Sequence, residues 1–333
     1  MNRQSVKRTI FIGLLFLAAF SICGVLFNEV AINVLSRVVI MSLYALSFNL
    51  MFGYTGMASI GHALYFGFGG YMFMILLTKT SLGIIPAAVI SIVSVIPVAW
   101  VLGTACLKNN MLAFSFLTMG LCTTVQLVIY KTTAIGGTVG ITYHFLPDWL
   151  SGFRALYFFI LLCVTMCSIV IYLLCQSPYC QMLKGVREND ERLIFLGVNI
   201  RKMRVSVFVI SAVFADIAGI LYAFRNSGAY TTSLDGAVSM QAIMMCIIGG
   251  QSSFVGPIVG SCIITPIQNY LSIQTKYYEC IIGIIVLLTA YFMRNGILSK
   301  TGPVMKLIRR IDHKLFPALN KAETLELPNN RQK

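Results

Sequence analysis

"GYTGMASIGHALYFGFGGY", residues 53–71, is a glycine-rich stretch inside an otherwise apolar chain. It contains six glycines and one histidine. Glycine weakens a helix interior by about 1 kcal/mol relative to alanine, and lipid offers no partner to an unpaired backbone group. A chain that places its least helical stretch among apolar runs therefore needs a special environment around that backbone.

The composition of the whole chain is that of a membrane protein. The chain has 333 residues, of which 58% are hydrophobic and 11% are charged, and its mean hydropathy is +0.84. A soluble protein would carry about a quarter of its residues as charged side chains. Several apolar runs reach the roughly 20 residues that a spanning helix needs. The sequence predicts an all-α polytopic protein embedded in a lipid bilayer.

The net charge of +14 comes from three clusters of basic residues. They lie before the first apolar run, in a central loop at 176–203, and near the C-terminus. The positive-inside rule places all three on the cytoplasmic side. We expect a cytoplasmic tail at 1–8, a transmembrane domain at 9–300 and a basic cytoplasmic tail at 301–333. Because the charges do not gather on one folded face, nucleic-acid binding is not expected.

The apolar runs predict about ten transmembrane helices. They lie at 9–28, 30–51, 60–78, 83–107, 111–130, 155–175, 204–224, 239–249, 254–271 and 277–294. An even number agrees with both termini lying inside. The eighth run is too short to span comfortably, which suggests a half-helix or a re-entrant segment.

Two glycine-rich breaks divide helices in opposite halves of the chain, near 53–61 and near 249–260. The helices of 30–130 begin outside, whereas those of 204–294 begin inside. Opposed topology with interrupted helices suggests an inverted repeat, with a pathway between the halves.

Each break has a purely structural interpretation and a functional one. Glycines can allow close helix packing, and we expect this of Gly67, Gly69 and Gly70. Unwound backbone can instead border a water-filled path, which we favour for the first break, while a plain surface turn is an equal alternative for the second. The predicted pathway residues are Gly53, Tyr54, Gly56, Ser59, Gly61, His62, Gly249, Gly250, Ser252 and Ser253. Within this set we expect His62 to have a structural role, because no second histidine or carboxylate lies nearby.

Four motifs in order along the chain resemble one family of permeases. They are "NLMFGYTGMASIGHALYFGFGGY" (49–71), "IGGTVGI" (135–141), "GVRENDERLIFLGVNIRKMRVSVFVISAVFADIAGILYA" (185–223) and "IIGGQSSFVGPIVG" (247–260). Together they are similar to the signatures of the LivM-type permeases of branched-chain amino acid ABC importers, over about two thirds of the chain.

The resemblance implies a bacterial inner-membrane permease subunit that translocates branched-chain amino acids. It implies three protein partners: cytoplasmic ABC ATPase subunits, a second homologous permease, and an external solute-binding protein that docks on a surface such as 131–154. The chain departs from the family pattern at several positions. These are Met57, Tyr65, Arg192, Leu193 and Asp216. They leave the solute open, and urea and short-amide permeases share the scaffold.

The central loop contains an amphipathic segment, "DERLIFLGVNI", with Leu193, Leu196 and Ile200 at helical spacing. The simpler interpretation is a charged loop exposed to solvent, with no binding role. The resemblance instead implies docking on the ATPase. The predicted coupling residues are Arg187, Glu188, Asp190, Leu193, Leu196 and Gly197.

The chain carries no signature of catalysis or of a bound cofactor. It has no GxxxxGK[ST] phosphate loop, so ATP hydrolysis is expected on separate subunits. The ten cysteines include no CxxC pair, and no metal site is expected. The rival class is a self-sufficient secondary transporter or channel, which would more often carry intramembrane carboxylates. A membrane scaffold without transport is a third alternative.

Two charges lie deep within predicted helices. Arg37 and Asp216 are each about eight residues, or roughly 12 Å, from the outer end of their helix. Because single charges at such depth are usually paired, we predict an ion pair between them. The alternative is that Arg37 snorkels outward and Asp216 faces water.

Overall fold

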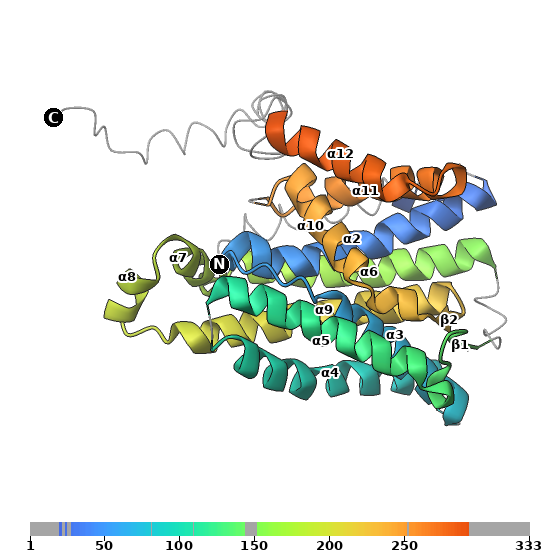
Figure 1. The fold of residues 1–333 in the computed structure, drawn as a ribbon, viewed down its shortest axis with the longest axis horizontal. Coiled ribbons are helices and arrows are strands. Elements are labelled where there is room, and N and C mark those ends of the chain that lie inside the picture. The colour runs from blue at the N-terminus through green and yellow to red at the C-terminus, as the bar shows by residue number, and fades with distance from the viewer. Residues whose placement is uncertain are drawn as a thin grey trace.

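The computed structural model describes residues 28–292 apart from 81, 109, 144–151 and 252, together with residues 20, 21 and 24. The α-helices are α2 (Glu29–Thr55), α3 (Ala63–Lys79), α4 (Ile84–Cys106), α5 (Met111–Lys131), α6 (Phe153–Gln176), α7 (Pro178–Glu188), α8 (Asp190–Phe195), α9 (Ile200–Arg225), α10 (Gly236–Gly249), α11 (Gly256–Gln274) and α12 (Tyr278–Phe292). The long helices form one bundle, with α7 and α8 at one end of it (Figure 1).

The all-α membrane architecture predicted from composition is confirmed. Among the described residues, five helices are long and apolar enough to cross a membrane: α2, α4, α5, α6 and α9. α3 and α10 are shorter apolar helices. The predicted first helix, 9–28, lies almost wholly outside the described residues, as do the tails 1–8 and 301–333, so the ten-helix count stays a prediction.

α2 and α9 form the centre of the bundle. The Ser211 hydroxyl on α9 donates a hydrogen bond to the Ser47 carbonyl on α2 at 2.6 Å, and both residues are buried. α2 also packs against α6, α10 and α11, whereas α9 packs against α3 and α4. Most of the residues along α2 are buried, because neighbouring helices surround it on nearly all sides.

α2 ends later than the first glycine-rich break predicts. Gly53 and Tyr54 are still helical, and Gly56 ends the helix in the left-handed conformation, with φ 75°. Its N–H donates to the Phe52 carbonyl at 3.2 Å, which is the usual way a glycine closes a helix. The non-helical segment is therefore 56–62 rather than 53–61.

The segment 56–62 runs back alongside the helix that it follows. The Ser47 hydroxyl lies 3.0 Å from His62 Nε2, although Ser47 is eight residues before the end of α2. At 1.5 Å per residue, the chain has returned by roughly 12 Å. α3 therefore begins beside the middle of α2 and is shorter for that reason.

A second returning segment, 226–235, follows α9 and has no counterpart among the predicted breaks. It contains β2 (Gly228–Ala229), which pairs antiparallel with β1 (Ile141–Thr142), and the 3-10 helix η3 (Thr231–Leu234). A further 3-10 helix, η1 (Thr133–Ile135), precedes β1. β1 and β2 lie at the end of the bundle opposite α7 and α8 (Figure 1).

The depth of this second segment follows from its neighbours on α3. The rings of Phe224 and Phe73 are 6.2 Å apart, so the end of α9 is level with the second half of α3. Leu234, only ten residues later, packs on Gly67. The chain has returned along α3 by six residues, or roughly 9 Å, before α10 begins.

The other predicted break, near 249–260, is a tight connection between α10 and α11. A Cβ atom at Gly249 would lie 1.8 Å from the Gly256 carbonyl oxygen, so only glycine allows this approach. Pro257 lies in the first turn of α11, as predicted, where its missing N–H costs nothing.

Gly249→Ala should lower the stability of the protein, because the methyl group meets backbone rather than a side chain that can move. Overpacking of this kind costs about 1–3 kcal/mol. The matched control is Gly120→Ala on α5, where the added atom meets nothing within 4 Å. Melting temperatures in detergent check the difference, and equal values for the two variants would contradict the packing described.

Candidate functional site

The two shortened helices, α3 and α10, begin next to each other inside the bundle. The backbone N–H of Ala63 donates to the Ser239 hydroxyl at 2.8 Å, and the bond is buried. The first N–H groups of a helix have no partner within that helix, so α10 satisfies one such group of α3. Since each helix N-terminus carries a partial positive charge, two of them converge in the interior.

Buried polar side chains surround this junction. The His62 ring stacks on Tyr44, with ring centroids 5.4 Å apart and planes 23° apart, and its Nε2 lies 3.0 Å from the Ser47 hydroxyl. The Ser59 hydroxyl and His62 Nδ1 are buried without a hydrogen-bond partner in the described part of the chain. A buried polar group without a partner is rare in native structures, which marks this as a polar centre inside an apolar bundle.

The structure places the residues of the first predicted break at two depths. Gly53 and Tyr54 lie in the last turn of α2, and Gly56 is exposed beyond it. Ser59, Gly61 and His62 are buried deeper. Gly61 packs against the Thr118 carbonyl on α5.

The residues of the second predicted break lie beside the end of α2. Gly249 ends α10, and Gly250 follows it with φ 108°. Asn49 Nδ2 on α2 donates to the Ser253 carbonyl at 3.3 Å, and the Gln251 carbonyl lies against Gly53. Ser252 is outside the described residues. Both predicted breaks therefore touch the last two turns of α2.

α7 also reaches the end of α2. Arg187 Nη1 donates to the Gly53 carbonyl at 2.5 Å, and Lys184 Nζ lies 5.4 Å from the centre of the Tyr54 ring. The last four carbonyls of a helix lack partners within the helix, and cations are favoured there. Arg201 makes the same kind of contact with the end of α4, donating to the Thr104 carbonyl at 3.1 Å.

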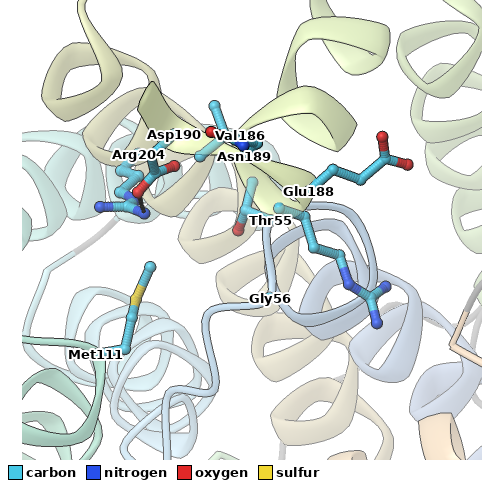
Figure 2. A pocket seen from close by; sticks show the side chains of 9 residues that line it. Thr55, Gly56, Met111, Val186, Glu188, Asn189, Asp190 and Arg204 are labelled. Carbon is cyan, nitrogen blue, oxygen red and sulfur yellow. Dashed lines mark hydrogen bonds and ion pairs between the residues drawn. The ribbon is translucent and has the colours of Figure 1, made fainter. Parts of the chain in front are cut away.

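A cavity of about 350 Å³ lies beside the contact of Arg187 with Gly53, between the end of α2, the start of α5, α7, α8 and the first part of α9. It is lined by Thr55, Gly56, Met111, Val186, Arg187, Glu188, Asn189, Asp190 and Arg204. Figure 2 shows Asp190 beside Arg204 on one side and Thr55 with Gly56 at the end of α2. Arg204 and Asp190 form an ion pair at 2.5 Å. Four of the predicted positions, Gly56, Arg187, Glu188 and Asp190, therefore meet at one cavity.

The three residues of the apolar stripe predicted for the central loop do not share one exposed face in the structure. Leu193 packs on Gly185 and Ile200 is buried, so only Leu196 of the predicted three is on the surface. The exposed apolar residues are Ile194, Phe195 and Leu196, which are 61%, 90% and 76% exposed. Gly197 follows with φ 78° and turns the chain toward α9. The sequence did carry a signal for this exposed patch, because residues 193–196 are four consecutive apolar residues. One face of a six-residue helix cannot bury all four.

The predicted ion pair between Arg37 and Asp216 is wrong. Asp216 is fully buried, and both its carboxylate oxygens lie 3.4 Å from the Ser91 hydroxyl on α4. It also lies against Gly69 of α3. Arg37 is half-buried elsewhere, one helical turn after Asn33, which accepts a hydrogen bond from Arg225 at the end of α9. Two side chains at equal depth on two helices meet only if both helices turn those side chains toward each other.

Because the pair is not formed, exchanging the two charges should not rescue assembly. Asp216→Arg should prevent folding, since a buried charge without a partner costs several kcal/mol, and adding Arg37→Asp should not restore it. Asp216→Asn keeps a polar group beside Ser91 and should fold. The yield of monodisperse protein in detergent measures each outcome, and recovery by the double variant would restore the ion-pair interpretation.

The comparisons with known proteins were consistent with this architecture. Residues 30–290 match the family described as "Branched-chain amino acid transport system / permease component". The permease LivM of the high-affinity branched-chain amino acid transport system of Escherichia coli is 23% identical over 88% of this chain and 76% of its own length. A probable LivM of Methanocaldococcus jannaschii is 24% identical over 81% of this chain and 94% of its own.

A more distant relative matches only part of the chain. The ribose import permease RbsC of Haemophilus influenzae is 25% identical over 40% of this chain and 43% of its own length. No solved structure matches significantly.

Proposed function

Since the chain belongs to the family of permease components of branched-chain amino acid transport systems, we propose that it is the transmembrane permease subunit of an ATP-driven importer. Its solute is a branched-chain amino acid delivered by an external binding protein. The observation that carries the proposal is the family match across 30–290, which spans both returning segments and the α7–α8 region. ATP binding and hydrolysis take place on separate cytoplasmic subunits.

The architecture supports an inverted repeat of the kind that transporters use. α2, the segment 56–62 and α3 run in one sense, and α9, the segment 226–235 and α10 run in the other if the chain crosses the bilayer at each long helix. Each unit is a full helix, a returning segment and a shortened helix. The counterpart of the first break is therefore 226–235 and not the connection near 249–260.

The solute path borders these returning segments and a second homologous permease. Non-helical backbone at membrane depth is tolerated where protein encloses it or where it lines a water-filled cavity. Ser59, Gly61 and His62 are enclosed in this conformation. The path forms when the two repeats separate at the junction of α3 and α10.

Coupling to ATP runs through α7 and α8. The exposed apolar residues Ile194, Phe195 and Leu196, at the end of α8 and just after it, are the docking surface for an ATPase subunit, since a large apolar patch beside a basic loop is unusual on a surface that stays in water. Arg187 then links that surface to the end of α2 through the Gly53 carbonyl.

The orientation follows from the positive-inside rule. The termini and α7–α8 lie in the cytoplasm of a bacterial cell, and the protein spans its inner membrane. The η1 and β1 region within 131–154 then lies outside, where it is held by β2, and serves as the docking surface for the solute-binding protein.

The alternatives differ in solute or in energy source. A urea or short-amide permease would share the scaffold. A self-sufficient secondary transporter or channel would more often carry an intramembrane carboxylate relay or ion site, whereas Asp216 is fully buried against α3 and α4.

Reconstitution in liposomes tests the proposal. The permease pair, the ATPases and the binding protein should accumulate L-leucine with ATP, and omission of the ATPases should abolish uptake. ATP-driven uptake of urea but not leucine would favour the amide permease. Uptake by this chain alone, driven by an ion gradient, would contradict the ATP-driven mechanism.

Arg187→Gln should separate ATP hydrolysis from transport, because it removes the contact with Gly53 and leaves the α8 surface intact. We expect ATPase subunits to bind normally while solute moved per ATP falls by about tenfold, as a charge-assisted bond is lost. Phe195→Ser should instead weaken ATPase binding.

Lys202→Gln is the matched control for Arg187→Gln, since Lys202 is exposed at the start of α9, outside α7 and α8. Co-purification measures the binding of the ATPase subunits. Assays in proteoliposomes measure the ratio of solute uptake to ATP hydrolysis. An unchanged ratio for Arg187→Gln would remove it from the coupling path.

A further inference from the structure

Two arginines lie close together where the N-terminal part of α2 meets the end of α9. Arg225 Nη2 donates to the Asn33 carbonyl at 2.9 Å and to Asn33 Oδ1 at 2.6 Å. Its Nη1 donates to Asn226 Oδ1 at 2.7 Å. Arg37 is one turn after Asn33 on the same face of α2, and its charge acts unfavourably on that of Arg225.

Neither arginine is neutralised by the described residues around it. No carboxylate there forms an ion pair with Arg37 or Arg225, and Asp216, the acid deepest in α9, lies against Ser91 instead. The Nε atoms of both arginines are buried without a hydrogen-bond partner. Charged side chains within membrane helices usually pair with one another or with a polar group, so this cluster has two unused donors and an excess of positive charge.

Two structural explanations account for only part of the cluster. Fastening α2 to α9 explains the Nη2 contacts of Arg225 with Asn33, but Arg37 makes no such contact with the described residues of α9. Snorkelling would carry the tip of the Arg37 guanidinium toward water, but it leaves the Nε atom buried without a hydrogen-bond partner among the described residues and does not neutralise the charge that acts on Arg225.

We propose that Arg37 and Arg225 form a binding site for the carboxylate of the transported amino acid. A carboxylate accepts hydrogen bonds from guanidinium groups in a planar fork, and it would neutralise the two like charges. The inference rests on the proposed function and deepens it, because it names the residues that recognise the solute. Urea and simple amides carry no carboxylate and would gain nothing from this pair.

The position of the pair favours a small solute over a docked protein. Arg37 is eight residues after Glu29, the first residue of α2, which corresponds to roughly 12 Å. A free amino acid can enter to that depth, whereas an acidic side chain on a docked binding protein cannot reach it without inserting backbone. Asn33, which lies one turn before Arg37 on α2 and accepts from Arg225 of α9, is exposed, so the cluster is open on one side.

The test uses the complete permease–ATPase complex without the binding protein. L-leucine should raise the melting temperature of the wild-type complex, and L-leucinamide, which lacks the carboxylate, should not. Arg37→Gln should raise the apparent Kd for leucine by about tenfold to a hundredfold, as loss of a charge-assisted pair predicts. Arg225→Gln should do the same, and Arg37→Lys, which keeps the charge but loses the fork, should fall between.

Arg154→Gln on α6 is the matched control, since Arg154 is exposed and near the same end of the bundle. Leucine binding by Arg37→Gln and Arg225→Gln equal to that of wild type would overturn the inference while leaving ATP-driven leucine import intact. Loss of affinity for the solute-free binding protein, with leucine binding unchanged, would overturn it in favour of a docking contact. Failure of the wild-type complex to import leucine would instead count against the proposed function.

Discussion

Every backbone N–H and C=O group inside a bilayer must find a partner within the protein, and the structure is arranged around this requirement. Two segments, 56–62 and 226–235, leave the helical conformation and run back into the bundle. Neither can face lipid. Neighbouring elements supply partners: Ser239 of α10 accepts from the first N–H group of α3, and β2 pairs with β1 at the end of the bundle. The first segment returns beside α2, where His62 meets Ser47, and the second returns beside α3, where Leu234 meets Gly67.

The same requirement makes the end of α2 a junction. Its last carbonyls lack helical partners, and Arg187 of α7 supplies one. The connection between α10 and α11 fills the space beside Gly53. In the proposed mechanism, a displacement of α7 would move the end of α2 through this hydrogen bond, and with it the chain that leads to α3. Apolar packing alone, being non-directional, would transmit such a displacement less specifically than a hydrogen bond.

Much of the architecture was predictable because its signals are local. Long apolar runs specify helices whatever surrounds them, so α4, α5 and α6 end within a few residues of their predicted bounds. Gly56 marks the end of α2 because a left-handed residue is needed there. The segment 226–235 was missed because its sequence, with one glycine between Ser227 and Asp235, reads as an ordinary surface loop. Its depth depends on Leu234 packing against Gly67, more than 160 residues earlier.

By itself, the sequence determined the class of the protein, its family and the positions of its apolar helices, because composition, motifs and hydrophobic run length are properties of the chain alone. Which side chains meet was decided only by the tertiary structure. Arg37 and Asp216 have equal depth, yet Arg37 lies one turn after Asn33, which accepts from Arg225, and Asp216 lies against Ser91. In an apolar bundle, depth follows from residue number, but rotation about each helix axis follows from packing, and rotation decides which polar groups become partners.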